Sequence, residues 1–200
     1  MLEVLGIGGS PRKGGNSDIL LKYILKGARD ADAKTEVVQL RDYQFQGCIG
    51  CEKCRTAEEC IGLRDAMVLI YPKIMQSKGL VLISPTHNYN VTALMKAFID
   101  RLYCYYSFSK ERPGSWSSSL AGQGRKAIIA CIGEQPDKES GIGFTLDAMR
   151  LPIEALGYEL IGEIPVLGIF DKLGIQKQSS LLDKAESWGN KLANQLKMIQ

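Results

Sequence analysis

The sequence predicts an α/β fold, in which a doubly wound, five-stranded parallel sheet carries helices on both faces. Short apolar runs of strand length alternate with longer segments of helical periodicity along the 200 residues. Such alternation is typical of parallel sheets that are covered by helices on both sides. No internal repeat, low-complexity tract or linker interrupts the alternation, so we expect one domain over residues 1–200.

The first half of the chain supplies three of the strands. Its expected strands are 2–8, 34–40 and 79–85, and its expected helices are 17–33, 65–77 and 91–106. Ile19, Leu20, Tyr23, Ile24 and Ala28 fall near one face of the first helix. Pro72 is expected to kink the second helix or to limit it.

The second half begins with a Ser- and Gly-rich segment and then resumes the alternation. Residues 107–124 read as a long loop, and loops of that length are usually functional or mobile. The remaining expected strands are 125–133 and 158–166, and the remaining helices are 143–157 and 178–197. A cysteine-rich insert at 48–60 is the other departure from the pattern.

The composition excludes several classes of protein. A net charge of +3, from 25 basic and 22 acidic residues, gives no basic patch for a nucleic acid. No stretch approaches the 18 apolar residues of a membrane span, and no signal peptide is visible. We therefore expect a cytoplasmic protein, in which crowded cysteines are more often metal ligands or redox groups than disulfides.

The first predicted strand ends in the glycine-rich stretch GIGGSPRKGGNS, residues 6–17. Pro11 breaks a dinucleotide fingerprint that would start at Gly6, and Gly15 stands where a P-loop requires lysine. What remains is a loop of hydroxyl, amide and backbone N–H donors that opens directly into a helix. Such a loop can bind one phosphate monoester, and the alternative is a solvated strand-to-helix turn.

Four of the six cysteines lie in the stretch CIGCEKCRTAEEC. Cys48, Cys51, Cys54 and Cys60 follow the spacing C-x2-C-x2-C-x5-C. Short spacings of this kind hold iron–sulfur clusters, although the last cysteine comes too late for a two-cluster ferredoxin run. Structural zinc usually takes two separated pairs. From the residues alone, a cluster, zinc, or thiols without a metal all remain open.

Three separated stretches resemble the flavodoxin-like NAD(P)H-dependent FMN reductases. They are the S-x-R-x-x-G-N-S pattern at 10–17, the segment SPTHNYNVTALMKAFIDR at 84–101, and Gly133-Glu134-Gln135. The cysteine spacing is similar to that of the iron–sulfur flavoprotein branch of this family. The resemblance implies a sheet order of 2-1-3-4-5 and loops that meet at one crevice.

The resemblance also implies the cofactors and their residues. FMN would be bound by Ser10, Arg12, Gly15, Asn16, Ser17, Pro85, Thr86, His87, Asn88, Tyr89, Asn90, Gly133, Glu134 and Gln135, and a 4Fe–4S cluster by Cys48, Cys51, Cys54 and Cys60. His87 and Tyr89 are the candidate catalytic residues. The alternative for His87, which stands where many relatives carry an aromatic, is that it satisfies a backbone group or faces solvent. Cys104 and Cys131 lie in apolar contexts and are expected in the core.

The resemblance implies an FMN-dependent redox protein that moves electrons between a reduced donor, FMN and a 4Fe–4S cluster. The donor would be NAD(P)H or a ferredoxin-like carrier, the acceptor a small molecule or a protein, and the assembly a homodimer or homotetramer. One alternative is an NAD(P)H-dependent FMN or quinone reductase without a functional cluster. Another is a non-enzymatic flavodoxin-like electron carrier, although we expect such carriers to be strongly acidic and this chain is not.

Overall fold

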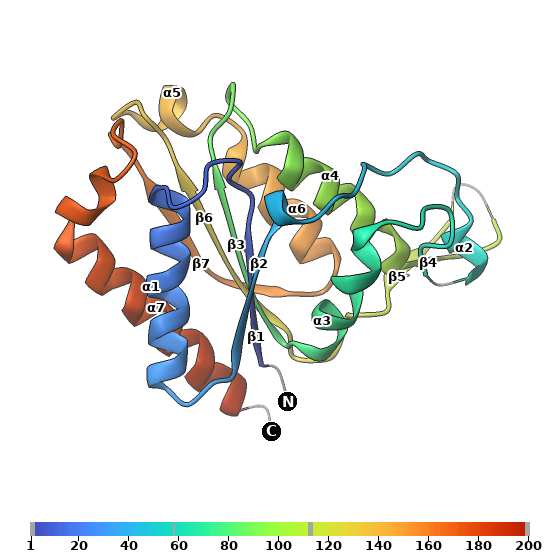
Figure 1. The fold of residues 1–200 in the computed structure, drawn as a ribbon. Coiled ribbons are helices and arrows are strands. Elements are labelled where there is room, and N and C mark those ends of the chain that lie inside the picture. The colour runs from blue at the N-terminus through green and yellow to red at the C-terminus, as the bar shows by residue number, and fades with distance from the viewer. Residues whose placement is uncertain (1–2, 58, 112–113, 199–200) are drawn as a thin grey trace.

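The computed structural model describes residues 3–57, 59–111 and 114–198 (Figure 1). The strands are β1 (Val4–Gly8), β2 (Thr35–Gln39), β3 (Gly79–Pro85), β4 (Tyr106–Phe108), β5 (Trp116–Ser118), β6 (Lys126–Ile132) and β7 (Glu159–Val166). The α-helices are α1 (Asn16–Asp30), α2 (Cys54–Ala57), α3 (Tyr71–Gln76), α4 (Ala93–Arg101), α5 (Lys138–Ile142), α6 (Thr145–Ala155) and α7 (Ser179–Lys197). The 3₁₀ turns are η1 (Leu40–Asp42), η2 (Ala66–Leu69), η3 (Leu102–Tyr105) and η4 (Gly174–Lys177).

Five strands form one parallel sheet in the order β2-β1-β3-β6-β7. This order confirms the predicted 2-1-3-4-5 arrangement, because β6 and β7 are the fourth and fifth strands of the sheet. Strands β1 and β6 are buried along their whole length, as expected of inner parallel strands covered on both faces. The strand order changes direction between β1 and β3, because β2 lies on one side of β1 and the later strands lie on the other. A crevice is therefore expected at the carboxyl ends of β1 and β3.

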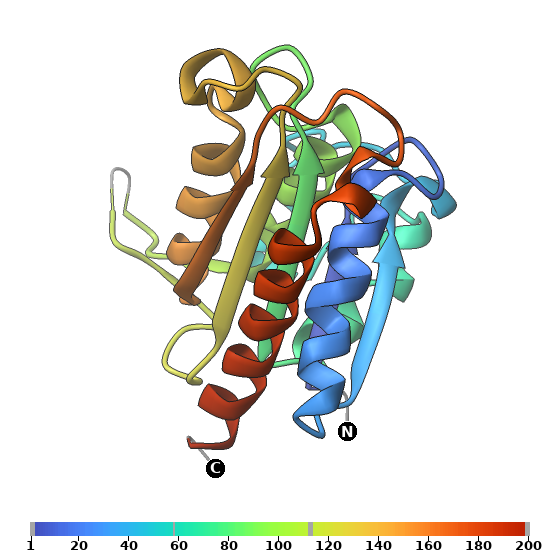
Figure 2. The same cartoon turned by 90° about the vertical axis from the view of Figure 1, so that its left-hand side faces the viewer.

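Helices cover both faces of the sheet. Figure 2 shows α1 and α7 side by side on one face, where Leu21, Ile24 and Leu192 belong to the core. Helices α3, α4 and α6 cover the other face, over a core that includes Phe98 and Met149. Cys104 and Cys131 belong to this second core, which confirms their predicted burial.

Glycines let α1 and α7 approach closely. A β-carbon added at Gly27 would lie 1.8 Å from the carbonyl oxygen of Glu186, and one at Gly189 would lie 1.7 Å from that of Ile24. Both separations are far below van der Waals contact. The two helix backbones therefore touch where neither residue has a side chain.

Two helices differ markedly from their expected extents, and one helix is additional. The segment 65–77 divides into η2 and α3, and Pro72 lies in the first turn of α3, where a missing N–H costs no hydrogen bond. The helix expected over 91–106 ends at Arg101, because the next four residues tighten into η3. The additional helix α5 precedes α6.

The described part of the segment 107–124, which omits residues 112 and 113, contains strand residues where a loop was expected. Tyr106–Phe108 pairs with Trp116–Ser118 in a short antiparallel ladder. The ring of Tyr106 meets that of Trp116 edge to face, with 5.3 Å between the ring centroids. Figure 1 shows this hairpin beside α2, away from the main sheet. Among the described residues, no helix has both the length and the apolar character that crossing a membrane requires.

Candidate functional site

A crevice opens at the carboxyl edge of the sheet, where the segments that follow four strands come together. It is lined by Ser10, Arg12, Gly15, Asn16, Ser17, Pro85, Thr86, His87, Ile132, Glu134, Ile169, Phe170 and Lys172. Nine of these are among the fourteen residues that the sequence predicts for FMN. Asn88, Tyr89, Asn90, Gly133 and Gln135 are predicted but lie outside the lining. The structure therefore brings the three predicted stretches to one place and leaves their outer members at its rim or behind it.

The N-terminus of α1 faces this crevice with unsatisfied backbone donors. Gly15 is the N-cap residue and, having no side chain, gives the first turn no capping hydrogen bond. The first N–H groups of a helix have no partner within the helix, and they attract anions together with the helix dipole. The side chain of Arg12 lines the same crevice and supplies a full positive charge. This end of the crevice is suited to a phosphate group.

Asn16 differs from its predicted role. Its side-chain amide donates to the carbonyl of Asp171 over 2.7 Å, and its side-chain oxygen accepts from the amide of Ile175 over 3.2 Å. The side chain therefore fastens the segment after β7 to the loop that connects β1 to α1. This loop, residues 9–17, is predicted to bind a phosphate and is called the phosphate loop below. Its backbone N–H, in the first turn of α1, is the part of Asn16 left to meet an anion.

The residues after β3 form a tight two-residue turn. His87 and Asn90 exchange two backbone hydrogen bonds, of 2.8 and 3.1 Å. The two residues between them, Asn88 and Tyr89, have φ values of 48° and 64°, as a type I′ turn requires. A tyrosine in this left-handed region of backbone conformation is strained. The amide of Phe144 donates to the carbonyl of Tyr89 over 2.7 Å and helps to hold the turn.

His87 and Tyr89 are placed differently by this turn. The side chain of His87 lines the crevice and is exposed. Tyr89 is 57% exposed and lies outside the lining. His87 is therefore the better placed of the two candidate catalytic residues.

Gly133 packs behind the crevice. A β-carbon at this position would lie 2.0 Å from the carbonyl oxygen of Gly141 in α5. Its amide donates to the carbonyl of Val166 over 2.8 Å. Gly133 thus lets α5 approach the end of β6, while the neighbouring Glu134 reaches the crevice.

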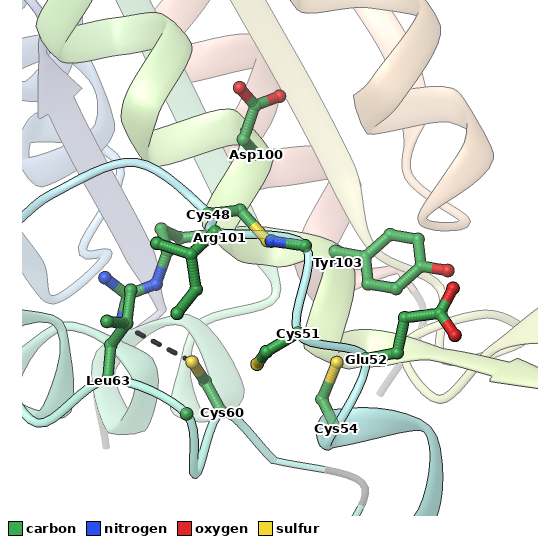
Figure 3. Close-up of a pocket in the computed structure, with 12 residues that line it drawn as sticks. Cys48, Cys51, Glu52, Cys54, Cys60, Leu63, Asp100, Arg101 and Tyr103 are labelled. Atoms are coloured by element: carbon green, nitrogen blue, oxygen red, sulfur yellow. Dashed lines mark hydrogen bonds between the residues drawn. The ribbon is translucent and has the colours of Figure 1, made fainter.

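The four clustered cysteines line a second cavity, with a volume of about 360 Å³. Figure 3 shows Cys51, Cys54 and Cys60 with their sulfur atoms turned toward a common space and Cys48 set apart from them. Among the described residues, which omit residue 58, no three His, Cys, Asp or Glu side chains are gathered closely enough to hold a single metal ion. All four cysteines nevertheless line the one cavity.

Two hydrogen-bond donors reach the sulfur atoms. The amide of Gly50 donates to Cys48 Sγ over 3.4 Å, and Arg101 Nη2 donates to Cys60 Sγ over 3.5 Å. Donors of this kind stabilise negative charge on sulfur and influence the potential of an iron–sulfur cluster. Burial raises the pKa of Cys54, and the neighbouring cysteines raise it further. A cation among the thiols would offset this mutual repulsion.

Sequence reasoning missed several lining residues. Ile169, Phe170 and Lys172 lie beyond the fifth strand of the sheet, at the same carboxyl edge as the predicted loops. Their position after a parallel strand was the available signal. Asp100, Arg101 and Tyr103 line the cysteine cavity from the end of α4 and from η3. Asp100 and Arg101 end the stretch 84–101 that resembles the family, but nothing in that stretch indicates that they meet the cysteines, which happens only in the folded chain.

Known proteins resemble this chain along most of its length. The sequence profile of NADPH-dependent FMN reductases matches residues 2–127. An iron–sulfur flavoprotein of Archaeoglobus fulgidus is 36% identical over 194 residues, which cover 96% of this chain and 79% of that protein. An iron–sulfur flavoprotein of Methanocaldococcus jannaschii is 33% identical over 100 residues, about half of each chain. The structure of an NAD(P)H:quinone oxidoreductase from Methanothermobacter marburgensis superposes with a TM-score of 0.74 at 17% identity, over 96% of this chain and 98% of that one.

Proposed function

This chain belongs to the iron–sulfur flavoprotein branch of the NADPH-dependent FMN reductase family, and on that premise we propose that it moves electrons between a reduced donor, FMN and a 4Fe–4S cluster. The observation that carries the proposal is that four cysteines line one cavity. This cavity is separate from the crevice that suits a phosphate group. When bound, FMN accepts a hydride and returns single electrons, and a 4Fe–4S cluster carries single electrons.

The crevice supports FMN as the flavin. The free amides of the first turn of α1 and the side chain of Arg12 suit its phosphate group. Pro85 at the end of β3, with Thr86 and His87 after it, lines the same crevice, and these three residues would lie against the ring. His87 is the candidate proton donor near the ring, and Tyr89 at the rim is a second candidate contact.

The cysteine cavity and the cysteine spacing support a cluster. Four cysteines line one cavity at short C-x2-C spacings, which are typical of iron–sulfur ligands, whereas structural zinc usually takes two separated pairs. A cavity of about 360 Å³ with hydrogen-bond donors to two of the sulfur atoms suits a larger, negatively charged group. Cys48, Cys51, Cys54 and Cys60 would hold it.

The partners follow from the same premise. We propose NAD(P)H or a ferredoxin-like carrier as the electron donor, and a small molecule or a protein as the acceptor. We also propose a homodimer or homotetramer. An exposed aromatic residue on the hairpin near the cysteines supports a contact there, since Trp116 is 54% exposed.

Metal and flavin analysis of protein purified without oxygen tests the proposal. We expect one FMN and about four irons and four sulfides per chain, with little zinc. FMN without iron would instead support the reductase alternative that lacks a functional cluster. Absence of FMN would contradict the flavoprotein assignment itself.

A pair of cysteine variants provides the matched control. Cys51→Ser removes one cavity thiol, and we expect it to lose most of the iron while it retains FMN. Cys131→Ala changes a cysteine buried in β6, and we expect it to retain both. Equal iron in the two variants would show that the cysteine cavity is not the cluster site.

A further inference from the structure

An ion pair lies behind the phosphate loop, outside the lining of the crevice. Arg41 comes from η1, directly after β2, and Asp18 from the first turn of α1. Arg41 Nη2 lies 2.8 Å from Asp18 Oδ2, and Arg41 Nη1 lies 3.0 Å from Oδ1. The two side chains are only 12% and 15% exposed. This two-pronged geometry is the strong form of an arginine–carboxylate pair.

The pair also holds the backbone of the loop. Arg41 Nη1 donates to the carbonyl oxygen atoms of Ser10 and Arg12, over 3.1 and 3.2 Å. Asp18 Oδ2 accepts from the amide of Gly14 over 2.7 Å. Gly14 has a φ of 66°, which glycine adopts at little cost. Thus Arg41 fixes the first part of the loop and Asp18 fixes the last part.

The charges of the pair affect an anion in opposite ways. A carboxylate at the N-terminus of α1 is favourable for the helix alone, but it repels a phosphate bound at the same helix end. Arg41 offsets the charge of Asp18, and its Nη1 also donates to two backbone carbonyl oxygen atoms, which carry partial negative charge. The loop can then present Arg12 to the phosphate beside the first amides of α1.

We propose that Arg41 and Asp18 form a clamp that positions the loop for the phosphate of FMN and keeps the local charge favourable to it. This inference rests on the proposed function, since it concerns the same crevice. Arg41 is a positioning residue that acts through the loop, because it does not line the crevice itself. The clamp therefore contributes to the preference for FMN over riboflavin, which has the same ring and no phosphate.

Flavin binding to the full-length protein, freed of flavin, tests the clamp. The dissociation constants of FMN and riboflavin are measured by fluorescence quenching for the wild type and for Arg41→Met. We expect the FMN constant to rise on the order of tenfold, as for the loss of a charge-assisted interaction. The riboflavin constant should change by less than about threefold. Equal losses for the two flavins, or no loss for FMN, would overturn the proposal.

Asp18→Asn tests the charge of Asp18 separately from its hydrogen bond to the loop. Asparagine keeps an oxygen that can accept from the amide of Gly14 but removes the negative charge. Because Arg41 then faces no carboxylate, we expect FMN to bind at least as tightly as in the wild type. The double variant Asp18→Asn/Arg41→Met should bind FMN more tightly than Arg41→Met alone. FMN binding weakened by Asp18→Asn as much as by Arg41→Met would show that the pair acts on FMN only by holding the loop, and it would overturn the proposed role of the charge.

Arg29→Met is the matched control. Arg29 lies at the other end of α1 and donates to Thr35 Oγ1 over 3.0 Å. Its removal should leave both flavin constants unchanged, and a phosphate-specific loss there would overturn the assignment to Arg41. Wild-type protein that fails to bind FMN would instead contradict the proposed function, which keeps the two failures distinct.

Discussion

Arg101 and Asp65 form an ion pair in which the arginine side chain is 1% exposed. Arg101 Nη1 lies 2.6 Å from Asp65 Oδ2, and Nη2 lies 3.1 Å from Oδ1. The same Nη2 donates to Cys60 Sγ, so the last residue of α4 contacts the cysteine cavity. Thr92, the N-cap of α4, bonds to Gly9 at the start of the phosphate loop. One helix of nine residues, about 14 Å long, therefore connects the surroundings of the two candidate sites.

The buried guanidinium should make Asp65 important for stability. Asp65→Asn leaves the charge of Arg101 without its counter-charge, and such a loss in a buried pair costs about 3 kcal/mol or more. The free energy of unfolding is measured by urea denaturation. Asp30→Asn is the control, because its pair with Lys26 is half exposed and should contribute less than about 1 kcal/mol. Similar losses in the two variants would show that Arg101 needs no buried partner.

The same carboxylate predicts a loss of stability in acid. Partial burial acts to raise the pKa of Asp65, but hydrogen bonds from Arg101 and from the amides of Met67 and Gln46 outweigh it and lower the pKa. A lowered folded-state pKa stabilises the protein above the unfolded value of about 3.9, and this stabilisation is lost as the pH falls through the folded value. The stability difference between wild type and Asp65→Asn should therefore be constant from about pH 5 to 7 and shrink below about pH 4. Urea titrations at a series of pH values measure it, and a difference that persists unchanged at pH 3 would exclude the coupling.

The sheet was predictable because its strands are nearly continuous apolar runs. β1, β3 and β6 each fall within an expected range, and their parallel arrangement brings their carboxyl ends to one edge. The three predicted loops therefore meet without any further information. Helix ends were less predictable: η3 ends the helix at Arg101 and leads into β4, which pairs with Trp116–Ser118. That pairing includes a ring contact between Tyr106 and Trp116. The serine-rich composition of the segment gives no indication of strands.

For the candidate site, the sequence predicts which residues come together. It predicts the contacts of the individual side chains less well. Asn16 matches the phosphate-loop pattern, yet its amide bonds to Asp171 and to the amide of Ile175. Arg41 belongs to no motif, and Arg101 ends the stretch 84–101 without any sign there of its ion pair or of its contact with Cys60. Their roles depend on partners that lie 23 and 36 residues away, and only the fold brings these partners together.

The six cysteines should differ in reactivity once any metal is removed. Burial raises the pKa of Cys104 and of Cys131 to about 12, so at pH 8 only about one part in ten thousand of each is thiolate. Cys48 and Cys51 are exposed. Iodoacetamide should therefore label Cys48 and Cys51 first in chelator-treated native protein, and Cys104 and Cys131 only after denaturation.

Peptide mass spectrometry at timed intervals measures this order, and denatured protein, in which all six cysteines should react, is the control. Protein that retains its iron should show slower labelling at Cys48 and Cys51 than chelator-treated protein. Rapid native labelling of Cys104 or Cys131 would contradict the packing of the core around α4 and β6.

Thr92 joins α4 to the start of the phosphate loop through a hydroxyl group that is buried. Its Oγ1 donates to the carbonyl of Gly9 over 2.6 Å and accepts from the amide of Met95 over 3.1 Å, and the residue is 2% exposed. Thr92→Val keeps the shape but leaves both partners without a hydrogen bond. We expect it to lower the free energy of unfolding by about 1–2 kcal/mol. Thr92→Ser keeps the hydroxyl group and should recover most of this loss, as measured by urea denaturation. If valine is tolerated, or if serine is as destabilising as valine, the hydroxyl group is not what connects α4 to Gly9.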